Sequence, residues 1–273
     1  MNTARIVLLC LGVFAGACRP DEQPATARSS SAPLTVHTTQ RSSFQVVGGD
    51  TLSDSARILA IHPERDGEAI VVVFTDPARR VLSGLAIVDR RMAAPQLLWP
   101  DSVSNVWWPG PHTLAFTTAT GDGIRLVVDI HAAELRVADT STAALARPAA
   151  LEASDSTMMR RARAYTDSVR VQVGGVPQGS ALTYSVTRLV PTPDGRFAAF
   201  HTAARDAQGT LTNPAWYALD RESGTVTPID QVTGAVSELR GEAGQWSESG
   251  SFFYAKGHGL WEAEVARAGA TSP

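Results

Sequence analysis

Residues 190–202 read VPTPDGRFAAFHT and carry the clearest fold signal in the chain. Pro193, Asp194 and Gly195 favour a tight turn, because proline fixes φ, aspartate bonds its own backbone and glycine tolerates a positive φ. The strand that follows, residues 197–200, is apolar at every position. A half-exposed strand would alternate polar and apolar residues, so this pattern predicts a strand that is buried on both faces between two layers.

Three other windows repeat this order of a turn followed by an apolar strand. They are residues 61–75 (IHPERDGEAIVVVFT), 107–118 (WWPGPHTLAFTT) and 245–256 (QWSESGSFFYAK). All four apolar strands end on or near an aromatic residue: Phe74, Phe116, Phe200 and Tyr254. A second strand is predicted shortly after each window, at residues 85–88, 125–130, 215–219 and 260–265.

The spacing of these aromatic residues indicates the kind of repeat. Phe74 and Phe116 are 42 residues apart, and Phe116 and Phe200 are 84 apart, which is twice 42. Tyr254 follows Phe200 by 54 residues. A period of about 40–45 residues is that of a four-stranded propeller blade. The windows resemble the TolB-type, WD40-like propeller repeats of bacterial envelope proteins, whose Pro-Asp-Gly turn precedes an apolar strand, and residues 192–200 match that motif cleanly.

The resemblance implies an all-β fold, a partial or small β-propeller-like array of antiparallel blades. A β-sandwich is the alternative, because it also has short strands at similar spacing. Residues 143–187 depart from the repeat. Within them, residues 148–169 are dense in Ala, Leu, Glu, Met and Arg and predict a helical insertion. Residues 169–173 and 181–186 predict a hairpin after it.

The first 17 residues have the features of a bacterial export signal. Arg5 gives a positive start, and residues 6–14 (IVLLCLGVF) are apolar. This run is about half of the ~20 residues that a membrane span needs, so the segment is typical of a signal peptide. Residues 15–18 (AGAC) resemble the lipobox of bacterial lipoproteins, with alanine where the family prefers leucine. The resemblance implies that Cys18 becomes the lipidated N-terminus, and plain cleavage to a secreted or periplasmic soluble protein is the alternative.

The rest of the chain divides into a tether and a body. Residues 18–43 are predicted to be a lipid-anchored flexible tether, because they are rich in Ser, Thr, Ala and Pro and lack apolar periodicity. Residues 44–273 are predicted to be the β-propeller-like domain with its helical insertion. We expect the protein in the bacterial cell envelope, at the outer membrane facing the periplasm, with the lipid as its membrane contact.

Composition and motifs exclude several classes of function. The chain has 24 Lys and Arg against 27 Asp and Glu, a net charge of −3. It has no basic stretch of the kind that binds nucleic acid, so no nucleic-acid partner is expected. The sequence contains no phosphate-binding glycine loop, zinc-protease helix motif, calcium loop or nucleophile elbow. No cofactor and no metal are therefore expected, and no catalytic residue is assigned.

Four residues are candidates for binding a partner. His62 and His112 lie near the turns before apolar strands, positions that share one rim in a propeller. Trp107 and Trp108 are adjacent, so in a strand their side chains point to opposite faces. One of the two could be exposed, as aromatic residues at partner-binding or sugar-binding surfaces are. Burial of both between blades is the alternative interpretation.

Two functions remain open from the sequence. The favoured one is a lipid-anchored, non-enzymatic binding or scaffolding module whose partner is an envelope protein or a glycan. The other is an envelope hydrolase that acts on peptide or glycan through a site built from rim loops, since propellers hold such sites without local motifs.

Overall fold

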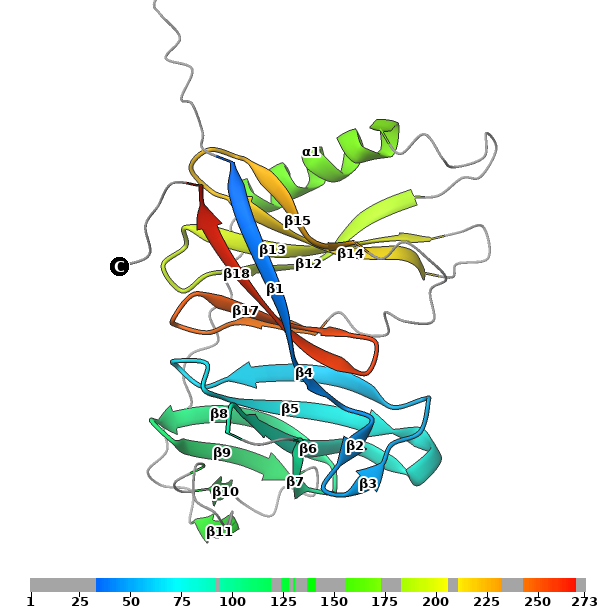
Figure 1. The fold of residues 1–273 in the computed structure, drawn as a ribbon, viewed down its shortest axis with the longest axis vertical. Coiled ribbons are helices and arrows are strands. Elements are labelled where there is room, and N and C mark those ends of the chain that lie inside the picture. Colours follow the sequence, from blue (N-terminus) through cyan, green and yellow to red (C-terminus); the bar gives the residue numbers. More distant parts are fainter. Residues whose placement is uncertain are drawn as a thin grey trace, which may run out of the picture. The chain divides into compact units, whose positions relative to one another are not determined.

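Four antiparallel sheets of four strands each form most of the β structure (Figure 1). The computed structural model describes residues 33–91, 94–118, 124–127, 130, 137–140, 156–172, 183–205, 211–231 and 243–268. Residues 31–273 form one compact unit, and residues 1–30 form a separate unit that lies outside the described residues. Each four-stranded sheet is called a blade below and is numbered by its order along the chain.

The blades have the following bounds. Blade 1 contains β4 (Arg57–Pro63), β5 (Ala69–Asp76), β6 (Val81–Asp89) and β7 (Gln96–Trp99). Blade 2 contains β8 (Val103–Gly110), β9 (Thr113–Thr118), β10 (Ile124–Val127) and β11 (Val137–Thr140). Blade 3 contains β12 (Thr183–Pro191), β13 (Phe197–Arg205), β14 (Leu211–Asp220) and β15 (Val226–Gln231). Blade 4 contains β16 (Gly244–Trp246), β17 (Ser251–Lys256), β18 (Gly259–Arg267) and β1 (Leu34–Ser43). The short pair β2 (Val46–Val47) and β3 (Asp50–Thr51) and the 3-10 turn η1 (Pro77–Arg79) complete the irregular connections.

Blade 4 is assembled from both ends of the described chain. β1 runs antiparallel to β18, with Leu34 opposite Arg267 and Ser43 opposite Gly259. This pairing corrects the predicted boundary of the tether, because residues 34–43 form the outer strand of a blade and the β domain begins there. The signal peptide at residues 1–17, Cys18 and the rest of the predicted tether lie outside the described residues.

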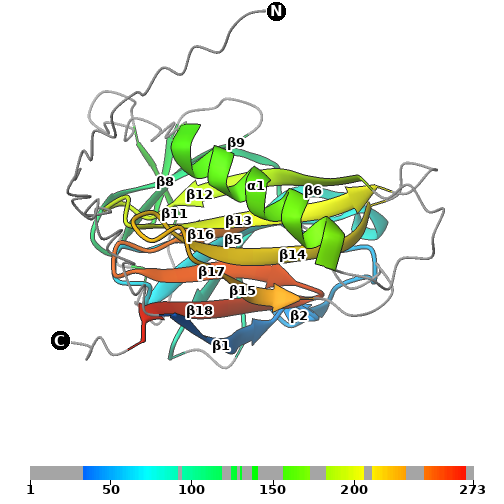
Figure 2. The same cartoon turned by 90° about the horizontal axis from the view of Figure 1, so that it is seen from above.

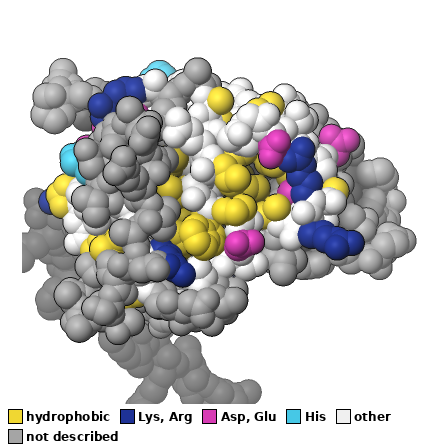
Figure 3. Space-filling model, turned by 90° about the horizontal axis from the view of Figure 1, so that it is seen from below, with side chains coloured by type: hydrophobic (Ala, Val, Ile, Leu, Met, Phe, Trp, Pro, Cys, Tyr) yellow, Lys and Arg dark blue, Asp and Glu magenta, His cyan; other side chains and the backbone are white. Residues whose placement is uncertain are grey.

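Hydrophobic layers join neighbouring blades into a stack. One cluster joins blades 4 and 1, a second joins blades 1 and 2, and a third joins blades 3 and 4. The blades therefore follow one another in space in the order 3, 4, 1, 2 (Figure 1). Within the described residues, no hydrophobic cluster joins blade 2 to blade 3. Figure 3 views the end of the stack opposite α1, where hydrophobic side chains gather in the middle and charged side chains border them.

The second strand of a blade shows why the apolar windows predicted layers. In β5, Ile70 and Val72 pack toward blade 4, whereas Val71 and Val73 pack toward blade 2. All four are at most 8% exposed, and full burial of each such side chain contributes about 1.5–3 kcal/mol. The predicted burial on both faces is thus confirmed. Each blade is a four-stranded antiparallel sheet, and β1 supplies the fourth strand of blade 4. The structure is therefore an all-β, propeller-like array of antiparallel blades and not a sandwich.

Helix α1 (Ser156–Gln172) is the helical insertion between blades 2 and 3. Met158, Ala162 and Thr166 recur every four residues and form its buried face. That face lies across the outer face of blade 3 (Figure 2). There Tyr165 contacts Phe200 and Tyr217 edge-on. The predicted strand at residues 169–173 is wrong, because the helix continues to residue 172. No helix in the described part of the chain is long and apolar enough to cross a membrane.

The turn between the first two strands is built alike in three blades. In blade 3 the Gly195 N–H donates to the Thr192 carbonyl at 2.9 Å, and Gly195 has a φ of 67°. Bonds of 3.0 and 3.3 Å close the equivalent turns at residues 64–67 and 247–250. In blade 2 the left-handed residue of the turn is His112, with a φ of 54°, a conformation that costs a non-glycine residue about 1 kcal/mol.

Candidate functional site

One pocket of ≈ 670 Å³ is lined by the first strand, or the turn after it, of all four blades. Its volume falls in the range of ligand-binding pockets, about 300–1,000 Å³. The lining residues come from β4, β8, β12 and β16 or from the turns that follow these strands, and β16 contacts both β4 and β12. They are Ala60, Ile61, His62, Pro63, Glu64, Arg65, Val106, Trp107, Trp108, Gly110, Pro111, Arg188, Pro193, Gln245, Trp246, Ser247 and Glu248.

Two tryptophan side chains of the pocket lining donate hydrogen bonds to a neighbouring blade. Trp108 Nε1 donates to the His62 carbonyl at 3.2 Å and so links blade 2 to blade 1. Trp246 Nε1 donates to the Val190 carbonyl at 2.8 Å and links blade 4 to blade 3. Each bond satisfies a strand carbonyl and fixes an indole ring. The walls are therefore held in place without a ligand.

Arg188, a positively charged side chain of the pocket lining, lies near two neutral imidazoles: His62, which also lines the pocket, and His201, which is buried on β13. Arg188 lies on β12, directly opposite His201 of β13 in the strand register. Burial, and then the charge of Arg188, lowers the pKa of His62 to about 4, and the same two causes lower the pKa of His201 to about 4. The His201 ring also contacts the Thr187 hydroxyl, with 2.7 Å between Nδ1 and Oγ1. Both imidazoles are therefore uncharged at neutral pH, whereas the Arg188 guanidinium keeps its positive charge.

The two carboxylates of the pocket have identified partners. Glu64 is 2% exposed, and its Oε1 accepts the His112 backbone N–H at 2.6 Å and lies 2.9 Å from His112 Nδ1. Glu248 stands at the surface, where its Oε2 lies 2.6 Å from Arg65 Nε. Glu64 thereby holds the left-handed turn at His112, and Glu248 ties the blade 4 turn to the blade 1 turn.

The predicted binding residues come together only in part. His62, Trp107 and Trp108 line the pocket, whereas His112 lies beside it and contacts Glu64. Trp108 packs toward blade 1, and Trp107 is 8% exposed with a buried Nε1 that has no hydrogen-bond partner among the described residues. Neither tryptophan presents a broad open face.

Sequence reasoning missed three of the groups that define the pocket, namely Glu64, Arg188 and Trp246. Glu64 and Trp246 had a usable signal, since both belong to turn windows whose alignment places them near His112 and Trp107. Arg188 had none, because it follows residues 143–187, where the repeat pattern is lost.

Comparison with known proteins gives distant likenesses. No protein-family model and no curated protein sequence matches the chain. Among solved structures, it is similar to TolB from Acinetobacter baumannii, with 12% identity over 76% of this chain and 44% of that one and a TM-score of 0.24. The periplasmic gluconolactonase of Pseudomonas aeruginosa gives 11% identity over 72% and 46%, with a TM-score of 0.23. The β-propeller domain of Cps50 (Swd1) from Myceliophthora thermophila gives 12% over 76% and 53%, with a TM-score of 0.24. The chain thus spans about half the length of these structures, and the assignment of its fold rests on the sheet topology described above.

Proposed function

We propose that this protein is a lipid-anchored, non-enzymatic binding module of the bacterial cell envelope, and that its partner inserts a peptide segment into the pocket between the four first strands. The observation that carries the proposal is the pocket itself, because every blade contributes its first strand to one cavity. The predicted lipid on Cys18 supplies the location, at the outer membrane facing the periplasm.

The fixed walls suit a binding site. Trp108 and Trp246 are already bonded to the carbonyls of His62 and Val190, so binding need not order them. A site that is organised in advance loses less side-chain freedom when its ligand arrives, and affinity rises accordingly.

The chemistry of the lining favours a peptide over a glycan. A sugar ring stacks on an open aromatic face, but Trp107 and Trp246 are only 8% and 4% exposed. The accessible lining instead combines prolines, the amide of Gln245, the imidazole of His62 and the charged guanidinium of Arg188. Such a mixture can pair with backbone amides and with a carboxylate of an extended chain.

One observation favours a second candidate, an envelope hydrolase. A buried carboxylate that orients an imidazole is the arrangement of a general base, and Glu64 lies 2.9 Å from His112 Nδ1. Turnover of casein peptides or of a chromogenic glycoside series that Glu64→Gln abolishes would support the hydrolase. The binding module predicts that no such turnover occurs.

The proposal can be tested by co-purification from detergent-solubilised membranes. Wild type, Arg188→Met and Arg163→Met are compared, since Arg163 is an exposed arginine on α1. We expect a discrete set of partners that is retained by wild type and Arg163→Met and reduced about tenfold by Arg188→Met, because a lost charged bond is worth about 1.5 kcal/mol or more. Equal retention by all three would contradict the assignment of the pocket, and unchanged unfolding curves confirm that the variants are folded.

The anchor has its own test. Mass spectrometry of the mature N-terminus from a membrane fraction should find a diacylated Cys18. A free Cys18 thiol in a soluble fraction would refute the lipid anchor and leave the pocket assignment to the co-purification result.

A further inference from the structure

The pocket opens at one end of the blades. Its exposed lining residues are Arg65, Pro111, Pro193 and Glu248, and each lies in the turn between the first and second strands of its blade. In every blade this turn lies where the first strand ends and the second begins, so the four turns lie at the same end of the strands. That end is called the mouth end below. The 2.6 Å contact between Arg65 and Glu248 spans part of the pocket opening.

The chain enters the β body at this same end. The Pro33 carbonyl accepts the Ala268 N–H at 2.8 Å, and Leu34 is paired with Arg267. Arg267 belongs to the end of β18 that lies beside the blade 4 mouth turn, since Glu264 is opposite Ser251. The far end of β1, at Ser43, lies instead beside Gly259.

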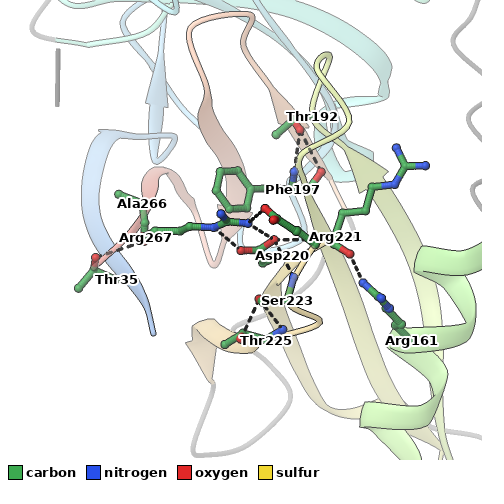
Figure 4. A network of polar contacts seen from close by, with 11 residues as sticks. Thr35, Arg161, Thr192, Phe197, Asp220, Arg221, Ser223, Thr225, Ala266 and Arg267 are labelled. Carbon is green, nitrogen blue, oxygen red and sulfur yellow. Dashed lines mark hydrogen bonds and ion pairs between the residues drawn. The ribbon is translucent and has the colours of Figure 1, made fainter. Parts of the chain in front are cut away.

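A network of polar contacts continues from that entry point to the mouth (Figure 4). Arg267 Nε donates to Asp220 Oδ2 at 2.6 Å, which binds β18 to the turn after β14. The next residue, Arg221, donates its N–H to the Arg196 carbonyl at 3.0 Å, in the mouth turn of blade 3. The start of β1 is therefore linked, through β18, to the blade 3 turn at the mouth end.

From this placement we infer that the pocket mouth faces the membrane that holds Cys18, and that the inserted peptide belongs to a protein of that same membrane. This inference rests on the lipid anchor of the proposed function. The backbone from Cys18 to Pro33 spans at most about 50 Å when fully extended. The opposite end of the body lies about 25 Å from the point where the chain enters it, the length of an eight-residue strand such as β5.

Charge at the mouth end favours a protein partner over a lipid head group. In the described turns of that end, exposed or partly exposed arginines and carboxylates are equal in number. They are Arg65, Arg90, Arg91, Arg196 and Arg221 against Asp66, Glu68, Asp194, Glu222 and Glu248. A surface that docks on anionic lipid needs an excess of basic residues. Charge therefore does not orient the mouth, and the inference rests on the point where the tether joins the body.

Energy transfer from two matched positions tests the orientation. The mature chain is coupled through the Cys18 thiol to maleimide-lipid vesicles that contain a membrane-surface acceptor dye. A donor is placed through an azido-phenylalanine at Glu248 of the mouth end, or at Asp54, an exposed acidic residue of the opposite end. Chemical coupling makes the result independent of whether the native chain is lipidated, which mass spectrometry decides separately.

The expected result is stronger transfer from position 248 than from position 54, and the same ratio at low and high salt. Equal transfer, or stronger transfer from position 54, would overturn the inference. Loss of the difference at high salt would overturn the role given to the tether, because charge attraction alone is screened.

Discussion

Leu34, at the start of β1, lies opposite Arg267, at the end of β18, although 233 positions separate them in the sequence. This pair closes blade 4 and fixes the point where the tether meets the body. Leu34 is 5% exposed and packs in the layer between blades 3 and 4. The residue thus joins the outer strand to the hydrophobic core.

Leu34→Ala should destabilise the fold by about 2–4 kcal/mol, because it removes a buried side chain and leaves a cavity. The control is Thr38→Val, an exposed position on the same strand, which should change the free energy of unfolding by no more than about 0.5 kcal/mol. Urea unfolding measures both. If the two variants were equally stable, β1 would not be part of the cooperative core.

Asp220→Asn should destabilise the protein by about 3 kcal/mol, because it leaves a buried, hydrogen-bonded ion pair without its negative charge. Burial opposes the charge of Asp220, but bonds from Arg267, Glu222 and Ser223 outweigh it and hold the pKa of the carboxyl below its usual value. The contribution is therefore present above about pH 4 and is lost as the pH falls through that lowered pKa. Glu222→Gln removes an exposed partner of the same arginine and should cost less than about 1 kcal/mol. Equal losses from both variants would refute the special role of Asp220.

The lowered pKa of His201 predicts that the protein loses stability in mild acid. Its pKa is about 4 in the folded protein and about 6.5 when unfolded, so between these values the unfolded chain binds more protons. Stability should decrease as the pH falls from about 6.5 to 4, by about 3 kcal/mol for this residue. His201→Gln should reduce that decrease in urea unfolding measured across the same range. Parallel pH profiles for wild type and variant would contradict the prediction.

Trp246→Phe should cost more than Trp216→Phe, although both remove a buried indole of the same hydrophobic cluster. Trp246 Nε1 donates to the Val190 carbonyl, whereas the buried Trp216 Nε1 has no hydrogen-bond partner in the described part of the chain. The two losses of unfolding free energy should differ by about 1 kcal/mol or more, because only Trp246→Phe leaves a buried carbonyl without its donor. Thermal unfolding compares the two, and a larger loss for Trp216→Phe would show that the cross-blade bond contributes little.

The repeat was predictable because a doubly buried strand leaves a continuous apolar signature. Phe74, Phe116, Phe200 and Tyr254 all lie on second strands and are at most 2% exposed, which matches the spacing of the sequence windows. The outer strand β1 was not predictable in this way. Its side chains are mostly exposed, so Ser and Thr are tolerated there, and its partner β18 lies at the other end of the sequence.

The candidate site was only half predictable for a related reason. His62, Trp107 and Trp108 stand in repeat windows, and their position beside a turn indicated a shared rim. The pocket, however, is a product of how blades stack, which no local pattern encodes. Arg188 enters it from blade 3 only because β12 lies beside β16.

Under the proposed function, a peptide of an envelope protein occupies the pocket between the four first strands. Photo-cross-linking in living cells tests it, with benzoyl-phenylalanine at Gln245 in the pocket and at Gln96 on the exposed outer strand of blade 1 as the control. We predict a discrete adduct from position 245 that protease removes, that glycan-degrading enzymes leave intact and that Arg188→Met weakens, with no such adduct from position 96. A glycan adduct at position 245, or the same adducts from both positions, would contradict the claim.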